Sequence, residues 1–142
     1  MVGAVWENVL LIAGCLLSIQ LWWENELKDN AVEFKSKQFA IYIVRIYQFL
    51  TREKNEYVLS KQLLRSGTSI GANIREGIQA FSKNDFTYKM SIALKESNET
   101  CYWLEILHET DYLTDAQFQS IYENCNELLR MLTAIVKTAK VP

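Results

Sequence analysis

A scarcity of helix-breaking residues is the feature that most limits what this chain can fold into. Among its 142 residues there are one proline, Pro142, and five glycines. Proline and glycine are the strongest local interruptions of a helix, so their scarcity favours long helices joined by short connections. The length suits a single domain with one hydrophobic core.

Apolar residues recur with helical spacing in four segments from position 31 onward. We expect helices at about 31–52, 60–80, 83–108 and 115–136. Ser60, Ser82 and Thr114 are the predicted N-caps, and the last two are followed at N3 by Asp85 and Gln117. Because short connections make successive helices antiparallel, we predict an all-α, up-down-up-down four-helix bundle over residues 28–142.

The stretch "QLLRSGTSIGANIREG", residues 62–77, has helical apolar spacing but contains Gly67 and Gly71. A glycine inside a helix costs about 1 kcal/mol relative to alanine, so each needs an offsetting gain. Both glycines fall on the apolar side of the expected helix, beside Ile70 and Ile74. They therefore predict that a neighbouring helix approaches closely at this point.

The segment before the bundle is apolar: residues 8–23, "NVLLIAGCLLSIQLWW", carry no charge. A membrane-spanning helix needs about 20 apolar residues, and no Lys or Arg precedes the segment as a signal peptide would require. "LIAGC" resembles a lipobox, but apolar residues follow its cysteine where a polar tether is expected. We expect residues 1–27 to be an apolar helical extension, either upstream translated sequence or a helix that packs on the bundle, rather than a membrane anchor.

Charge is unevenly distributed around a net value of −2 and a pI of about 5.5. Residues 28–95 hold twelve Lys/Arg against six Asp/Glu, whereas residues 96–142 hold three against eight. The acidic pI excludes a global basic field. The two halves could attract each other between subunits, the basic half could offer a binding surface, or the charges could simply solvate outer faces.

The residues that carry chemistry do not form a recognisable reaction centre. Glu105 and His108 make an E-x-x-H pair, but a di-iron bundle needs two such pairs and His108 is the only histidine. No phosphate-binding, dinucleotide-binding or zinc-protease motif is present. Three cysteines, Cys15, Cys101 and Cys125, include no C-x-x-C pair, which favours a reducing cytoplasm over a disulfide framework or zinc site. We predict no enzymatic activity, no metal and no cofactor.

Two segments, "S-I-x-x-N-I-x-E-G" and "K-E-S-N-E-T-x-Y-W-L", resemble the bacterial four-helix-bundle family named for the 23S rRNA intervening sequence. The resemblance covers about Lys28 to Val136, and the extension has no counterpart in it. The residues that carry it are Ser69, Ile70, Asn73, Ile74, Glu76, Gly77, Glu96, Asn98, Glu99, Tyr102 and Trp103.

This resemblance implies an up-down bundle that assembles into a ring, typically a homopentamer, without enzymatic activity. Relatives include the accessory proteins of diversity-generating retroelements, which bind a reverse transcriptase and nucleic acid through basic surfaces. The partners expected for this chain are therefore copies of itself, RNA or DNA, and a reverse transcriptase or another nucleic-acid enzyme. The alternative is a self-assembling structural protein with no nucleic-acid role.

Mixed apolar and charged flanks on the first three helices independently favour assembly, because a helix with a second apolar flank usually buries it. The predicted oligomer interface is Ile41, Val44, Arg65, Ser69, Asn73, Glu76, Ile92, Glu96, Glu99, Trp103 and Leu107. The predicted nucleic-acid contacts are Lys37, Arg45, Arg52, Lys54 and Lys61. The basic back of the first helix and the acidic flank of the third are expected to pair across a subunit boundary.

Overall fold

A computed structural model describes the backbone of residues 2–140 and the side chains of residues 17–21, 24, 27 and 30–140. Within residues 2–140 it contains four α-helices and no strand: α1 (Val2–Arg52), α2 (Leu59–Ile78), α3 (Lys83–Glu109) and α4 (Asp115–Ala139). The expected extension is thus helical and is assigned to the same helix as the first bundle segment. The side chain of Cys15 lies outside the described residues.

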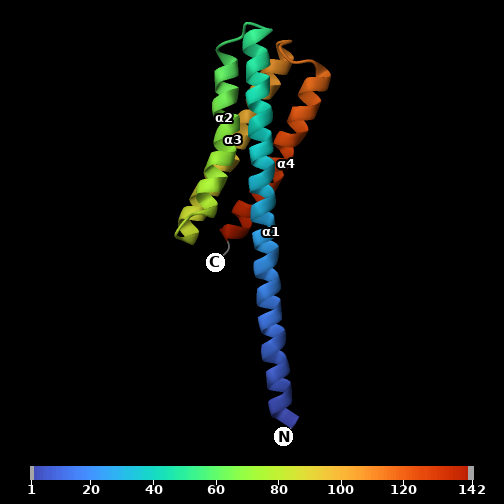
Figure 1. Ribbon diagram of the computed structural model, residues 1–142, viewed down its shortest axis with the longest axis vertical. Coiled ribbons are helices and arrows are strands. Elements are labelled where there is room, and N and C mark those ends of the chain that lie inside the picture. The colour runs from blue at the N-terminus through green and yellow to red at the C-terminus, as the bar shows by residue number, and fades with distance from the viewer. Residues whose placement is uncertain (1, 141–142) are drawn as a thin grey trace. The chain divides into compact units, whose positions relative to one another are not determined.

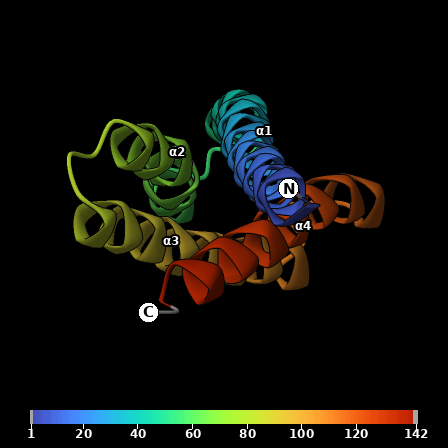
Figure 2. The same cartoon turned by 90° about the horizontal axis from the view of Figure 1, so that it is seen from below.

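The chain divides into two compact units, Met1–Ala31 and Val32–Pro142. The second unit is the predicted helical bundle, in which α2, α3 and α4 pack with the part of α1 that begins at Val32 (Figure 1). Seen along the bundle, α3 lies next to both α2 and α4 (Figure 2). Among the described residues, no helix combines the length and the apolar character that a membrane crossing needs.

One core joins all four helices of the second unit. The apolar spacing that predicted a helix over 31–52 is confirmed as a buried stripe. Phe39, Ile43, Ile46 and Leu50 are buried, and Tyr42 and Phe49 pack partly buried against the core. The other helices contribute Leu63, Ile70, Ile74, Met90, Ala93, Cys101, Leu104, Leu107, Ile121, Cys125, Leu128, Leu132 and Val136. These positions follow the 3.6-residue period of the sequence, so amphipathic patterning drives the assembly of the bundle.

The two glycines of α2 lie against α1, as predicted. A Cβ atom on Gly67 would stand 2.8 Å from Cγ1 of Ile43, closer than carbon atoms can pack. A Cβ atom on Gly71 would stand 3.3 Å from Oγ of Ser36. The missing side chains therefore allow α1 and α2 to approach closely, and this contact offsets the low helix propensity of glycine.

Two of the three predicted N-caps are confirmed. The Ser82 hydroxyl accepts a hydrogen bond from the backbone N–H of Asp85, and Thr114 forms a reciprocal capping box with Gln117.

The prediction for Ser60 is wrong, because α2 begins one residue earlier and Ser60 donates its hydroxyl hydrogen to the Glu56 carbonyl. The Glu56 carboxylate caps this helix instead, accepting hydrogen bonds from the N–H groups of Val58, Leu59 and Ser60 at 3.0, 2.8 and 2.6 Å.

Candidate interaction surfaces

Side-chain bonds between α2 and α3 set the register of the flank on which most predicted interface residues lie. Near one end, Thr100 donates a hydrogen bond to the Ser66 hydroxyl at 3.0 Å. Near the other, Lys89 pairs with Glu76 at 2.6 Å. Antiparallel helices held at these points bring Ser69 and Asn73 of α2 alongside the middle of α3. We call Arg65, Ser69, Asn73, Glu76, Ile92, Glu96, Glu99 and Trp103 the α2–α3 flank.

The small polar residues of this flank bond to their own helix. The Ser69 hydroxyl donates to the Arg65 carbonyl at 2.6 Å, and the Asn73 amide donates to the Ser69 carbonyl at 2.8 Å. Both side chains are half-buried and stay close to the helix surface. The middle of the flank along α2 therefore carries short polar side chains whose hydrogen bonds are satisfied within their own helix.

Two carboxylates give the α3 side of the flank its charge. Burial raises the pKa of Glu96, and the neighbouring charge of Glu99 raises it further, while Arg65 acts in the opposite direction. Glu99 accepts a hydrogen bond from the indole N–H of Trp103 at 3.1 Å. Within the described residues neither carboxylate makes an ion pair. Glu96 thus keeps an unfavourable electrostatic environment that an additional cation would relieve.

Trp103 lies at the border between this flank and the core. Its ring is half-buried against the hydrophobic core and meets Tyr102 edge-on at a centroid distance of 5.0 Å. The prediction that Leu107 lies in the oligomer interface is wrong, because its side chain is fully buried inside the subunit. The reason is that α3 packs against both α2 and α4, so its buried sector is wider than one apolar stripe.

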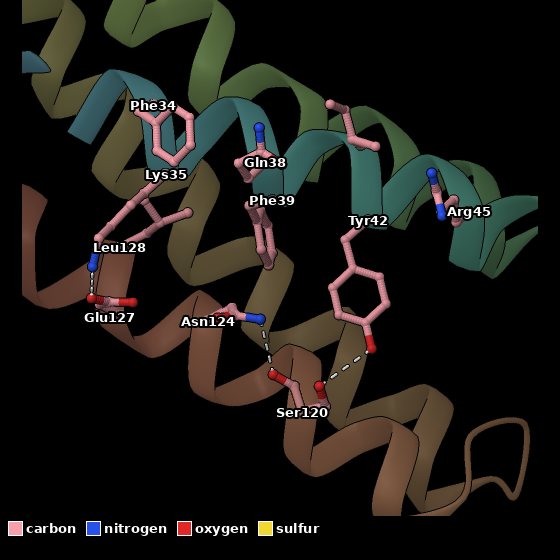
Figure 3. Close-up of a pocket in the computed structure, with 11 residues that line it drawn as sticks. Phe34, Lys35, Gln38, Phe39, Tyr42, Arg45, Ser120, Asn124, Glu127 and Leu128 are labelled. Atoms are coloured by element: carbon pink, nitrogen blue, oxygen red, sulfur yellow. Dashed lines mark hydrogen bonds and ion pairs between the residues drawn. The ribbon is translucent and has the colours of Figure 1, made fainter. Parts of the chain in front are cut away.

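A second surface is formed by the outward side of α1. Ile41 and Val44 are 42% and 37% exposed, and Lys37 and Arg45 are exposed beside them. We call these four residues the α1 face. Ile41 and Arg45 also border a pocket of about 680 Å³ between α1 and α4 (Figure 3).

The polar groups around that pocket are largely paired with one another. Lys35 forms an ion pair with Glu127, the Tyr42 hydroxyl bonds to Ser120 at 3.4 Å, and Asn124 donates to the Ser120 carbonyl at 3.1 Å (Figure 3). Phe39 and Leu128 of the core also line it. The pocket holds no group of acids, bases or nucleophiles arranged for catalysis.

The five predicted nucleic-acid contacts all have exposed side chains. Lys37, Arg45 and Arg52 lie on α1, Lys54 on the connection, and Lys61 in the first turn of α2. In the part of the chain that the structure describes, none of the five makes an ion pair. Lys54 lies 6.0 Å from the centroid of the Phe49 ring. Their charges are thus available to an anionic partner.

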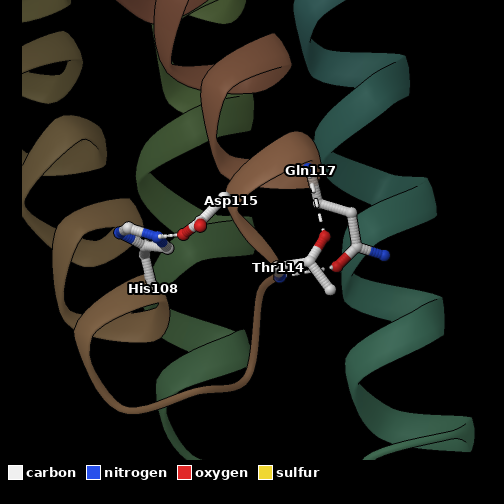
Figure 4. A network of polar contacts seen from close by, with 4 residues as sticks. All are labelled: His108, Thr114, Asp115 and Gln117. Carbon is white, nitrogen blue, oxygen red and sulfur yellow. Dashed lines mark hydrogen bonds and ion pairs between the residues drawn. The ribbon is translucent and has the colours of Figure 1, made fainter.

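The E-x-x-H pair is explained by structural contacts. His108 bonds to Asp115 at 2.7 Å beside the Thr114–Gln117 capping box (Figure 4). Its ring stacks on Phe118 at a centroid distance of 4.2 Å. Glu105 accepts a hydrogen bond from Tyr122 at 2.6 Å. Among the described side chains, no three His, Cys, Asp or Glu residues gather in a way that could hold a metal ion.

Sequence reasoning missed one pair of residues that the fold brings together. Cys101 of α3 and Cys125 of α4 place their sulfur atoms 2.9 Å apart in the core. A signal for this was present, because both cysteines belong to apolar stripes and stand equally far from Leu113 in the intervening turn. Positions equidistant from the turn of an antiparallel helical hairpin face each other.

Comparison with known proteins connects this bundle to one family. The profile of the 23S rRNA-intervening sequence proteins matches residues 28–134. A solved structure, a protein of unknown function from the S23 ribosomal protein family of Bacteroides thetaiotaomicron, is 55% identical with a TM-score of 0.76. That match covers 78% of this chain and 98% of the relative. No curated protein matches, and neither of the two descriptions names an enzymatic activity.

Proposed function

The chain belongs to the family of 23S rRNA-intervening sequence proteins, and on that basis we propose that it is a non-enzymatic, ring-forming scaffold. The ring binds nucleic acid or a nucleic-acid-processing partner, for which a reverse transcriptase is one candidate. A homopentamer is the subunit number that the family resemblance favours. The observation that carries the proposal is the pair of complementary surfaces on one subunit, the α1 face and the α2–α3 flank.

A ring needs two different surfaces of each subunit to meet, because a surface that meets only itself closes a dimer. The α1 face offers Lys37 and Arg45 around Ile41 and Val44. The α2–α3 flank offers Glu96 and Glu99 around Ile92 and Trp103. Apolar groups at the centre of each surface and opposite charges around them are the pattern of a specific interface.

The environment of Glu96 supports the same contact. Its raised pKa means that the ionised carboxylate destabilises the isolated subunit, and this cost grows as the pH rises through that pKa. A neighbour's cation would lower the pKa again, so assembly should release protons and strengthen with rising pH. We expect Glu96→Gln to stabilise the separated subunit and to weaken the assembly, two opposite effects that a purely internal role would not produce.

Light scattering on the full chain tests the ring directly. Arg45→Glu and Glu99→Lys should each lower the particle mass, and the two together should restore it because the attraction is re-created with reversed signs. Glu123→Lys is the matched control, since it makes the same charge change on an exposed position of α4. A monomeric wild-type chain at micromolar concentration would contradict the proposal, as would two single variants with unchanged mass.

Nucleic-acid binding is proposed to use the cations around the α1–α2 connection, Arg52, Lys54 and Lys61, which make no ion pair within the described residues. A ring repeats these charges once per subunit, which turns weak phosphate contacts into useful avidity. Binding should therefore tolerate many sequences and weaken steeply between about 50 and 200 mM salt. The probes are a structured RNA and a DNA duplex.

The double variant Arg52→Glu, Lys54→Glu should reduce binding at low salt without changing the particle mass. The matched control is Arg130→Glu, Lys137→Glu, which reverses two exposed charges of α4. An intact oligomer that binds neither probe at low salt would favour the second candidate, a self-assembling structural protein. That candidate rests on the same complementary surfaces but assigns no nucleic-acid contact to the basic residues.

A further inference from the structure

A pair of thiols lies inside the α3–α4 hairpin. The sulfur atoms of Cys101 and Cys125 are 2.9 Å apart, and both residues are free cysteines. Cys101 is 6% exposed at the edge of the core, and Cys125 is fully buried. A disulfide has an S–S distance of about 2.05 Å, so the two sulfurs need to approach by only about 1 Å to be joined.

The two thiols have different surroundings. The hydrogen bond with Cys125 lowers the pKa of Cys101, and it outweighs burial and the charge of Glu105, which act in the opposite direction. The same contact, together with burial, raises the pKa of Cys125. The Cys101 thiol donates a hydrogen bond to the Cys125 sulfur, and the Cys125 thiol donates to the Ser97 carbonyl at 3.4 Å. Cys101 is thus both the more accessible thiol and the one that ionises first, and thiolates are the species that react with oxidants.

We propose that Cys101 and Cys125 form a redox-active pair that hydrogen peroxide closes into an intrachain disulfide. The Cys101 thiolate attacks one peroxide oxygen, the O–O bond breaks, and Cys101 becomes a sulfenic acid while the other oxygen leaves as hydroxide. The Cys125 sulfur then attacks the Cys101 sulfur, and the S–O bond breaks. The hydroxide released first takes up the proton that Cys101 lost on ionising, and the hydroxide released second takes the Cys125 proton. Two thiols are thus oxidised, and one peroxide is reduced to two water molecules.

The oxidant has to be small, because Cys101 is largely buried and only its edge reaches solvent. The product joins α3 to α4 across the connection between them, residues that are 24 positions apart in sequence. Cross-linking lowers the conformational entropy of the unfolded chain, so the oxidised bundle should unfold at a higher temperature. The helix that is fixed in this way also carries Glu96, Glu99 and Trp103.

The experiment uses the full chain with Cys15→Ser, which leaves Cys101 and Cys125 as the only thiols. After treatment of the folded protein with hydrogen peroxide, mass spectrometry should find the loss of two hydrogen atoms and one peptide pair joining the two cysteines. The melting temperature should rise by about 10 °C and return after reduction. Oxygen addition without a cross-link, disulfides only between chains, unreacted thiols, or an unchanged melting temperature would each overturn the proposal.

Single-thiol variants test the roles of the two residues. In the Cys15→Ser background, Cys125→Ser should accumulate a sulfenic acid at Cys101 that dimedone traps, whereas Cys101→Ser should stay unmodified at Cys125. Circular dichroism checks that each variant keeps its helices, and alanine replaces serine at either position if the hydroxyl unfolds the bundle. Equal trapping at both positions would overturn the assignment of Cys101 as the attacking thiol.

Discussion

The α1–α2 and α3–α4 hairpins solve the same packing problem in different ways. In the first, α2 lacks side chains where it meets α1, because a Cβ atom on Gly67 would collide with Ile43. In the second, small or paired side chains meet in register, as Cys101 does with Cys125 and Glu105 with Tyr122. The first contact is therefore sensitive to added volume, and the second to the chemistry of the groups that meet.

The connections of the two hairpins differ in the side chain that caps the helix that follows. Both turn through a residue with positive φ, Asn55 at 52° and Asp111 at 66°, which Asn and Asp adopt more readily than most residues. The helix that follows is capped by a buried carboxylate, Glu56, in the first hairpin and by the exposed hydroxyl of Thr114 in the second. A charged cap makes the first connection dependent on pH, whereas a neutral cap does not.

The largest expected effect comes from adding volume to the α1–α2 contact. Gly67→Val should lower the free energy of unfolding by about 3 kcal/mol, because the new atoms meet the branched side chain of Ile43 in a packed core. Gly71→Ala is the control: its Cβ atom meets Ser36 at 3.3 Å, and the gain in helix propensity of about 1 kcal/mol offsets the tighter contact. Urea unfolding measures both, and equal effects would erase the distinction between the two glycines.

The second effect concerns the buried cap. Burial raises the pKa of Glu56, but hydrogen bonds from Leu59, Ser60 and Val58 more than compensate and hold it below its ordinary value. A lowered pKa contributes stability above the unfolded value of about 4.3, and this stability is lost as the pH falls through the folded value. Glu56→Gln should cost about 2 kcal/mol at neutral pH and flatten the acid limb of the stability profile.

Thr114→Ala provides the comparison at the other connection. It should cost about 1 kcal/mol, by the same amount at pH 4 and pH 7, since no charge is removed. Chemical unfolding at several pH values separates the two variants. If the stability of Glu56→Gln falls toward acidic pH as steeply as that of the wild type, the Glu56 carboxylate is not the source of the pH dependence of the first hairpin.

The third effect tests the polar pair of the α3–α4 contact. The hydrogen bond to Glu105, together with burial, raises the pKa of Tyr122 to about 12. Neutral Tyr122 therefore contributes stability that is present below the ordinary tyrosine pKa of about 10 and is lost as the pH rises through about 12.

Tyr122→Phe should cost about 1 kcal/mol, and Glu105→Gln should return the Tyr122 pKa toward 10. Ultraviolet titration of tyrosinate in the wild type, with Tyr122→Phe identifying the signal, measures this. An unshifted titration in Glu105→Gln would contradict the assignment of the raised pKa to that carboxylate.

The smallest effect is expected at the end of the same hairpin. Asp115 is almost fully exposed although it pairs with His108, and exposed pairs contribute little. Asp115→Asn should shift the melting temperature by less than about 3 °C, because the stacking of His108 on Phe118 and the Thr114 cap both remain. A larger loss would mean that the pair, rather than the cap, holds this connection.

Much of the fold could be read from local patterns. The stripe through Phe39, Ile43, Ile46 and Leu50 identified the buried side of α1, and Ser82 and Thr114 marked the starts of α3 and α4. Gly67 and Gly71 predicted a close contact between helices, because a residue that is unfavourable inside a helix needs a compensating gain. Each of these features depends on residues close together in the chain, so the sequence alone was sufficient.

The interaction surfaces were less predictable. Sequence spacing put Trp103 and Leu107 on one flank, yet Trp103 stays at the border of the core while Leu107 is fully buried. A helical period gives the direction of a buried stripe but not its width, which depends on how many neighbours a helix packs against. Because α3 contacts both α2 and α4, Trp103 lies at the border of the core whereas Leu107, one helical turn later, lies inside it.

By itself, the sequence determined four amphipathic helices, their bundle and their family, since periodicity, caps and motifs are properties of short stretches of chain. Only the tertiary structure decided that Glu56 rather than Ser60 caps α2, and that the facing cysteines Cys101 and Cys125 bring their sulfur atoms to within 2.9 Å. Both depend on geometry that no local pattern encodes. The left-handed turn at Asn55 directs the Glu56 carboxylate, and the rotation and register of α3 against α4 set which side chains meet.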